Sequence, residues 1–521
     1  MYGEPPPQGQ QYQPNQPMYP PPPQPYNANY NNNNNVPPNG YQQAPPNYGN
    51  QYADNPQNAE GQPFPHNKLP FEKEDGGNVK GWRAYKDVWA LVLWILNLGA
   101  FIGLSVLALQ VYSQNHSTTA GGVTSGTQYG GLTFDTSTFK IFGLSAVVGF
   151  GLSLLYLILV NTIPKLMIYI TFIASIIVYF GVTIYYFTQH YYSAAIVFLI
   201  FAVLYLLSFF WWRKRIPFAT EMLTSTINVM KRHPSTLLIG VITLIIQTAF
   251  SMWFVLTVVG TYQRYFSTTS NNARLNLAMV FLVFSYYWTS QVISYVAYVT
   301  LAGIYASVYF NTGPHPSLPS LKRAMTTSLG SICFGSLLIA LIEFLRYLIA
   351  VLRGSTDNPI LGIFLCIVDC LIGCFQGFFE WFNNYAFSGV AIYGKSYIQS
   401  AKRTWTLIKD RGVEAIINDN LINNVLFLGG LLVGVLCSLL GYLYLEISRP
   451  AFNQQGNMTP VVVMVCFIVG ISMFSTISMT ISSGVSTTFV CLAEDPQALQ
   501  RTQPELFEKI RQTWPRVVQG I

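Results

Sequence analysis

Ten apolar runs of about 20 residues, separated by short polar segments, fill the chain from residue 88 onward. A helix needs about that many apolar residues to cross the hydrocarbon core of a bilayer. The runs cover 88–112, 141–160, 166–187, 192–212, 235–260, 276–310, 328–352, 360–383, 425–446 and 460–490. The sixth run is long enough for one helix that projects into the cytosol, or for a helix followed by a second, short one. This pattern predicts an all-α, polytopic membrane protein with about ten transmembrane helices and a disordered N-terminal tail.

Two polar segments between the runs have the period of amphipathic helices. Their apolar residues recur on one helical face, at Ala219, Leu223, Ile227 and Met230 in the first segment and at Ile398, Ala401, Trp405 and Ile408 in the second. Basic residues flank both segments, which is typical of helices that lie on the anionic inner leaflet. A role in gating is the alternative for both.

The composition agrees with a membrane location. Only 9% of the 521 residues are charged, 51% are hydrophobic, and the mean hydropathy is +0.35. A soluble chain carries about 25% charged residues. This chain has too few of them to cover a water-facing surface, which excludes a multi-domain soluble enzyme.

The first 67 residues differ in composition from the rest. They hold 17 of the 30 prolines together with 14 Asn, 11 Gln and 8 Tyr, and they contain no Lys or Arg. Such a segment buries too little apolar surface to offset the entropy of ordering. We therefore expect a disordered cytoplasmic tail at 1–79, a transmembrane domain at 80–492 and a short cytoplasmic C-terminal tail at 493–521.

The predicted tail has two further properties. Its polyproline stretches, such as Pro20 to Pro23, fit an SH3-type or WW-type partner, and a solvated tail without a partner is the alternative. It lacks a charged segment followed by an apolar run, so we expect no cleavable signal peptide and expect the first apolar run to target the chain.

Basic residues are distributed unequally among the connections between runs. If the N-terminus is cytoplasmic, most Lys and Arg of these connections fall on the inner side. The positive-inside rule then places both termini in the cytosol. The two N-x-S/T sequons, at Asn115 and Asn457, both fall in loops that this topology places outside, where N-glycosylation occurs. We expect a multi-pass glycoprotein of the plasma membrane.

Motifs for catalysis or metal binding are absent from the sequence. It contains no Gly-rich phosphate loop, no His-Glu-x-x-His and no Gly-x-Ser-x-Gly, and its five histidines are scattered. All seven cysteines lie within or at the edge of the runs, so no extracellular disulfide is available. Cys366, Cys370 and Cys374 share a helix face, but without matching His, Asp or Glu they favour small-residue packing over a metal site. We predict no enzyme activity, no metal, no cofactor and no nucleic-acid partner.

Charged residues inside the runs carry more information, because a charge in lipid is costly. Glu343 and Arg346 lie three residues apart in the seventh run, so an intramembrane ion pair is expected, and a pair that only fixes helix packing is the alternative. In the eighth run, Asp369, Gln376 and Glu380 lie on one helical stripe. The two carboxylates need a cation, a proton or a partner such as Arg346. The stripe lines either a cavity or a packed polar seam.

The sixth run offers aromatic rings at helical spacing. Trp288, Gln291, Tyr295 and Tyr298 recur along it. Aromatic faces beside carboxylates bind quaternary ammonium groups through cation–π attraction of about 0.5–2 kcal/mol per ring. Simple packing is the alternative for each ring, because Trp and Tyr are common at membrane interfaces. We predict a substrate-binding site that combines these four residues with the polar stripe of the eighth run.

The C-terminal third resembles a known family. Choline transporter-like proteins have a signature similar to residues 382–434, FNNYAFSGVAIYGKSYIQSAKRTWTLIKDRGVEAIINDNLINNVLFLGGLLVG. The fungal branch of that family, the "pH nine sensitive" proteins, is similar in AIYGKSYIQSAKRTW, IINDNLIN and the terminal TTFVCLAEDPQALQRTQPELFEKI. The resemblance is specific over about residues 375–515. It implies the same ten-span topology with both termini inside.

Site residues are carried over only where positions match. The matching positions in the loop, which we expect to shape a turn and anchor a helix, are Ala391, Ile392, Tyr393, Gly394, Lys395, Ser400, Ala401 and Lys402. Glu380 matches at the end of the eighth run. The sequence departs from the animal members in its short, cysteine-free first outer loop, 113–139, and in having Tyr385-Ala386-Phe387 where they have Asn-Ala-Tyr. These departures weaken the transfer of choline specificity.

The resemblance implies a plasma-membrane transporter of choline or a related organic cation, with the lipid bilayer and a small organic solute as its partners. Alternating exposure of a midplane site is the expected mechanism. The alternative is a non-transporting membrane scaffold or lipid-handling protein whose tail recruits cytosolic partners.

Overall fold

The computed structural model describes residues 85–117, 136–213, 215–265, 273–356, 358–411, 413–448 and 459–513. All of them belong to one compact unit of the chain, and within them the secondary structure is helical, with no β-strand. The predicted tail at 1–79 lies outside the described residues, together with its candidate SH3 or WW motif.

Nine helices of the described ranges are long and apolar enough to cross a membrane. They are α1 (Val88–Ser117), α2 (Thr136–Thr162), α3 (Pro164–Thr188), α6 (Ser235–Tyr265), α7 (Ala273–Tyr309), α9 (Leu329–Gly354), α10 (Pro359–Tyr393), α12 (Val413–Ser448) and α13 (Thr459–Glu494). The remaining predicted run, 192–212, forms α4 (Tyr192–Trp212), whose apolar stretch Ala195–Phe210 is shorter. The all-α membrane fold is confirmed, and the long sixth run forms a single helix of 37 residues, α7.

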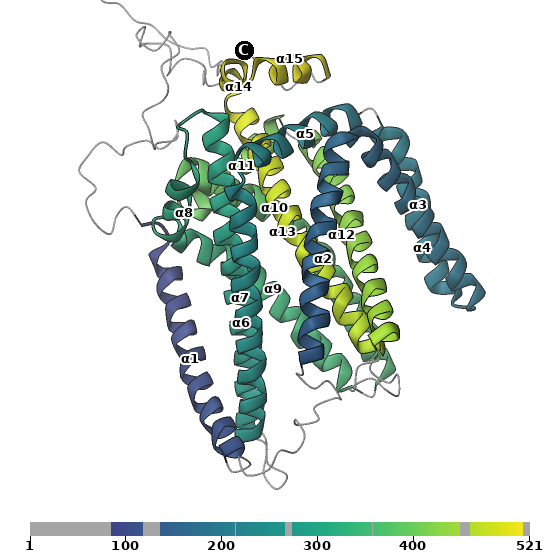
Figure 1. Ribbon diagram of the computed structural model, residues 1–521, viewed down its shortest axis with the longest axis vertical. Helices are drawn as coiled ribbons and strands as arrows, with labels where there is room; N and C mark the ends of the chain where they lie inside the picture. The colour runs from purple at the N-terminus through teal and green to yellow at the C-terminus, as the bar shows by residue number, and fades with distance from the viewer. Residues whose placement is uncertain are drawn as a thin grey trace, which may run out of the picture. The chain divides into compact units, whose positions relative to one another are not determined.

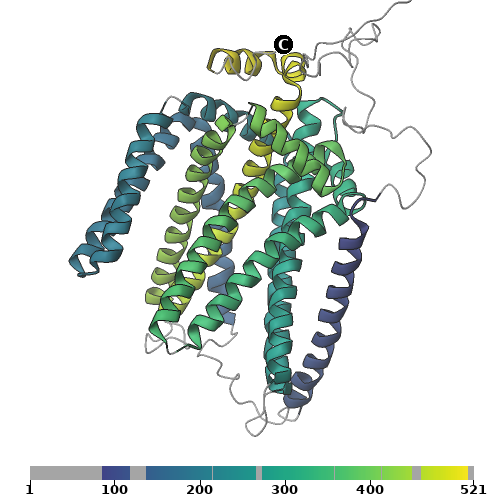
Figure 2. The ribbon, with the colours of Figure 1, turned by 180° about the vertical axis from the view of Figure 1, so that it is seen from behind.

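The spanning helices are arranged around α13. This helix packs against α12, α2, α7, α10 and α6, while α9 packs between α7 and α10. The helices α1, α6 and α7 lie together at one edge, and the α3–α4 hairpin lies at the opposite edge (Figure 1). The view from behind shows α9 and α10 crossing the array obliquely as a pair (Figure 2).

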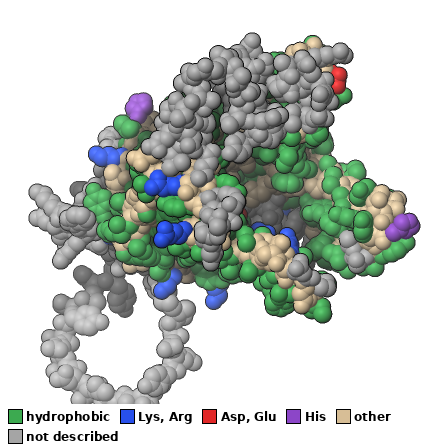
Figure 3. Space-filling view, turned by 90° about the horizontal axis from the view of Figure 1, so that it is seen from below, with side chains coloured by type: hydrophobic (Ala, Val, Ile, Leu, Met, Phe, Trp, Pro, Cys, Tyr) green, Lys and Arg blue, Asp and Glu red, His purple; other side chains and the backbone are tan. Residues whose placement is uncertain are grey.

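Hydrophobic side chains cover much of the described surface seen in Figure 3. On the α3–α4 hairpin, Ile177 is 64% exposed and Leu204 is 56% exposed. An apolar surface of this extent is unfavourable in water and favourable against lipid tails. The exposed apolar residues therefore fit a protein embedded in a bilayer.

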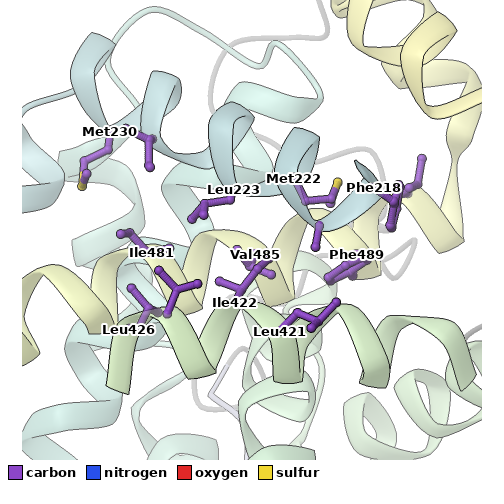
Figure 4. Close-up of a cluster of buried hydrophobic side chains, with 14 of the residues drawn as sticks. Phe218, Met222, Leu223, Met230, Leu421, Ile422, Leu426, Ile481, Val485 and Phe489 are labelled. Carbon is purple, nitrogen blue, oxygen red and sulfur yellow. The ribbon is translucent and has the colours of Figure 1, made fainter. Parts of the chain in front are cut away.

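The first amphipathic segment, α5 (Ile216–Arg232), buries its apolar face inside the protein. Met222, Leu223 and Ile227 have no exposed surface. Figure 4 shows side chains of α5 packed against residues of α12 and α13, among them Ile422 and Val485. The prediction that this face lies on the lipid leaflet was therefore wrong. Helix α12 begins before its predicted apolar run, and Leu421 and Ile422 in this extension, together with α13, offer α5 a protein surface to cover.

The second amphipathic segment, α11 (Tyr397–Arg411), keeps part of its apolar face on the surface. Ile398 is 50% exposed and Trp405 is 49% exposed, whereas Ile408 is nearly buried. Contact of this face with the inner leaflet stays a prediction. The other short helices are α8 (Ser317–Met325), α14 (Pro496–Thr502) and α15 (Pro504–Thr513), of which α15 packs on α5. Residues 496–511 of the predicted C-terminal tail are thus ordered on the same end of the bundle as α5 (Figure 1).

Candidate functional site

The helix that carries the polar stripe, α10, is well defined at both ends. It begins at the N-cap Asn358, whose side chain accepts a hydrogen bond from the Ile360 backbone N–H, and Pro359 occupies its first turn. It ends at Gly394, which adopts the left-handed conformation at φ 60° that glycine accommodates without strain. The matching loop position Gly394 thus shapes a turn, as expected from the resemblance.

The polar stripe of α10 faces α9. The Arg346 guanidinium of α9 donates through Nε to Asp369 Oδ1 at 2.9 Å and through Nη1 to Gln376 Oε1 at 2.9 Å. The Gln376 amide Nε2 donates in turn to Glu380 Oε1 at 2.6 Å. The three residues of the stripe are therefore joined to one cation, which is one of the partners the two carboxylates were predicted to need.

Helix α7 joins the same network through Gln291. Its Nε2 donates to Glu343 Oε1 of α9 at 2.7 Å. The sequence predicted that Glu343 and Arg346 pair with each other on one helix face. In the structure, Arg346 instead pairs with Asp369, and Glu343 accepts a hydrogen bond from Gln291, because the neighbouring helices supply better-placed partners. Glu343 still interacts electrostatically with both Arg346 and Glu380. We call these six residues the three-helix polar network: Gln291, Glu343, Arg346, Asp369, Gln376 and Glu380.

The network lies within the spanning segments. Arg346 is about 12 Å and Asp369 about 15 Å along their helix axes from the α9–α10 connection, at 1.5 Å per residue. Gln291 is 18 residues from either end of α7. Three carboxyl groups and one guanidinium therefore meet at membrane depth, where charges mark solute or ion pathways. The Arg346 and Asp369 side chains are 39% and 26% exposed on the protein, so the pair is not sealed in a core.

The aromatic rings of α7 separate into two groups. The Trp288 indole N–H donates to the Cys333 carbonyl at 3.1 Å, and its ring belongs to an apolar cluster with Val292 and Ala340. The Tyr295 ring centroid lies 4.3 Å from that of Phe387 at an interplanar angle of 36°, and Tyr295 interacts electrostatically with Glu380. Tyr298 is buried and contacts Tyr295. The structure thus joins Gln291 to the polar network by a hydrogen bond, while the contacts of Trp288, Tyr295 and Tyr298 are those of packing.

The sequence did not predict an anchor at the end of α13. The Glu494 carboxylate, at the end of α13, accepts hydrogen bonds from Tyr393 Oη at 2.8 Å and from Arg403 Nη2 at 2.6 Å. The bond with Glu494 raises the pKa of the Arg403 guanidinium above its ordinary value. Both Tyr393 and Arg403 lie in the family-like motif, but their common partner is 91 residues from Arg403. The anchor fixes α10, α11 and α13 to one another.

A second unpredicted anchor is Asp87, which precedes α1. Its Oδ2 accepts from Ser331 Oγ at 2.6 Å and from the Tyr397 backbone N–H at 2.8 Å. Tyr397 in turn donates through its hydroxyl to Asn383 Oδ1 at 2.7 Å. The segment leading into α1 is thereby attached to α9 and to the first turn of α11.

The remaining predicted sites can be placed only in part. Asn115 lies in the last turn of α1, and Asn457 lies outside the described residues. Cys366, Cys370 and Cys374 are exposed on α10. Within the described ranges, no group of three His, Cys, Asp or Glu residues forms a candidate metal site.

Comparison with known proteins gives consistent matches. A family model described as "Plasma-membrane choline transporter" matches residues 196–497. A protein named Protein PNS1 from Mycosarcoma maydis is 37% identical over 515 residues, which cover 93% of this chain and 96% of the relative. A protein of the same name from Cryptococcus neoformans var. neoformans is 36% identical over 92% of this chain and 92% of its own length. Another from Gibberella zeae is 37% identical over 84% of this chain and 84% of its own length.

Proposed function

Because the chain belongs to the plasma-membrane choline transporter family, we propose that it carries choline or a related organic cation across the plasma membrane. The family membership supports a membrane transporter. The identity of the solute, the membrane in which the chain lies and the residues that bind the solute are what we propose. The solute binds at the three-helix polar network, and the helices around it expose the site to one side of the membrane at a time.

The observation that carries the proposal is the excess of carboxyl groups in the network. Asp369, Glu343 and Glu380 outnumber the single Arg346 guanidinium. Carboxylates at membrane depth need a cation or a proton. A solute cation supplies the positive charge, and Tyr295, which interacts electrostatically with Glu380, is the aromatic residue proposed to contact it.

The first test is uptake of labelled choline into liposomes that contain the purified chain. Saturable uptake above that of empty liposomes, with a pH gradient imposed in either direction, is the expected result. A folded, correctly oriented sample without uptake of choline or related cations would contradict the proposal and favour the scaffold alternative. A variant lacking residues 1–67 is expected to retain flux, because a carrier depends on its spanning helices.

The site residues are tested by neutralisation. Asp369→Asn and Glu380→Gln are each expected to lower kcat/KM for choline by at least about tenfold, the equivalent of about 1.4 kcal/mol. Glu508→Gln is the matched control, because Glu508 is a half-exposed carboxylate on α15, away from the network. Normal uptake by both site variants, with thermal stability unchanged, would show that the solute binds elsewhere.

A further inference from the structure

Arg346 holds a position that a solute cation would also need. Its guanidinium lies against the backbone of α10 at Gly373, where an added Cβ would be 3.6 Å from Arg346 Cζ. From there it bonds directly to Asp369 and, through the Gln376 amide, connects to Glu380. The Arg346 guanidinium thus interacts with both carboxylates of α10, directly with one and through Gln376 with the other. These are the two groups that bind the solute in the proposed function.

The Arg346 side chain also has a second carboxylate within its range. Glu343 lies three residues earlier on the same helix, a spacing that brings two side chains together. The two groups already interact electrostatically. Gln291 occupies Oε1 of Glu343, and within the described residues no hydrogen bond to its Oε2 is found. A rotation of the long arginine side chain, which is 39% exposed, would exchange Asp369 for Glu343.

We infer that Arg346 acts as a tethered substitute for the solute: it pairs with Asp369 and is linked through Gln376 to Glu380 while the carrier is empty, and it moves to Glu343 when a solute cation binds. This inference rests on the proposed function. In this inference Arg346 has a positioning role when the empty carrier changes back to the conformation that faces the other side of the membrane. Carboxylates without a counter-cation oppose that conformational change within the membrane.

The test compares two fluxes in the same proteoliposomes, loaded with labelled choline and held at zero membrane potential. Efflux into choline-free buffer requires the empty carrier to return, whereas exchange against external unlabelled choline does not. Arg346→Gln is expected to raise the ratio of exchange to efflux at least about tenfold over the wild type. Arg346→Lys retains the charge and is expected to bring the ratio back to within about threefold of the wild type.

Arg353→Gln is the matched control. Arg353 is an exposed arginine in the last turn of the same helix, and its loss should leave the ratio unchanged. The ratio does not depend on how much protein folds, because both fluxes come from one preparation. A purely structural role of Arg346 would lower both fluxes together.

If Arg346→Gln yields no folded protein, Glu343→Gln tests the inference instead. Without its second partner the guanidinium stays on Asp369, so the KM for choline is expected to rise at least about threefold. The ratio of exchange to efflux is expected to stay near that of the wild type, because Arg346 still accompanies the empty carrier. An unchanged ratio in Arg346→Gln, or an unchanged KM in Glu343→Gln, would overturn the inference while leaving transport itself intact. Absence of both fluxes in the wild type would instead refute the transport proposal, and the inference with it.

Discussion

At the scale of single residues, backbone conformation explains why glycine follows Tyr393, the last residue of α10. Gly394 has φ 60° and ψ 21°, a left-handed conformation that costs an L-residue with a Cβ about 1–2 kcal/mol. The turn directs Tyr393 to Glu494 and starts the path to α11. The resemblance to a family motif therefore has a physical basis at this position.

Gly394→Ala is expected to lower the free energy of unfolding by about 1–2 kcal/mol, because alanine resists the left-handed conformation. Thermal unfolding in detergent measures the loss. Gly354→Ala is the control, since Gly354 has open space around it, has no positive φ and is the last helical residue of α9. Equal unfolding midpoints for the two variants would show that the turn tolerates a different geometry.

At the scale of helices, apolar run length predicted the spanning elements well, because the bilayer imposes the length directly. It underestimated α10, which continues ten residues beyond the predicted end at 383. The predicted run stops at Asn383, yet Asn383 is fully buried within α10 and accepts a hydrogen bond from Tyr397 of α11. A single sequence does not disclose such a partner.

The same limit applies to the candidate site. Helical spacing placed Asp369, Gln376 and Glu380 on one stripe, and that local periodicity is fixed by the helix itself. The pairing of Arg346 with Asp369 depends on how α9 packs against α10, so spacing along α9 alone pointed to Glu343 instead. Contacts across helices require the tertiary arrangement.

The packing of α5 leads to a prediction at this scale. Leu223 has no exposed surface and packs in the cluster formed with α12 and α13. Leu223→Ala is expected to cost about 2–5 kcal/mol of unfolding free energy, measured by denaturation in detergent. Leu318→Ala, on α8, removes the same atoms from a side chain that is 74% exposed and should change stability by less than about 0.5 kcal/mol. If the two costs were equal, α5 would not be docked on the protein.

At the scale of the whole molecule, the short helices and the positive charge indicate one cytoplasmic face. The helices α5, α11, α14 and α15 lie at the same end of the spanning helices (Figure 1), and Lys231, Arg232, Lys402 and Arg403 belong to α5 and α11. The positive-inside rule predicts that this end is cytosolic. It then predicts that the C-terminal end of α1, which carries Asn115, lies on the outer side.

Glycosylation tests that orientation directly, because glycan transfer occurs only on the outer side of the membrane. Treatment with a glycosidase is expected to lower the apparent mass of the wild type. Asn115→Gln and Asn457→Gln should each remove part of that mass shift. The double variant should show no mass shift. Gln500→Asn in the double variant creates a sequon with Thr502 on exposed α14 and is expected to stay unmodified. A glycan acquired only through Gln500→Asn would invert the topology, place the Glu494 anchor outside and move the proposed inner leaflet contact of α11 to the other side of the membrane.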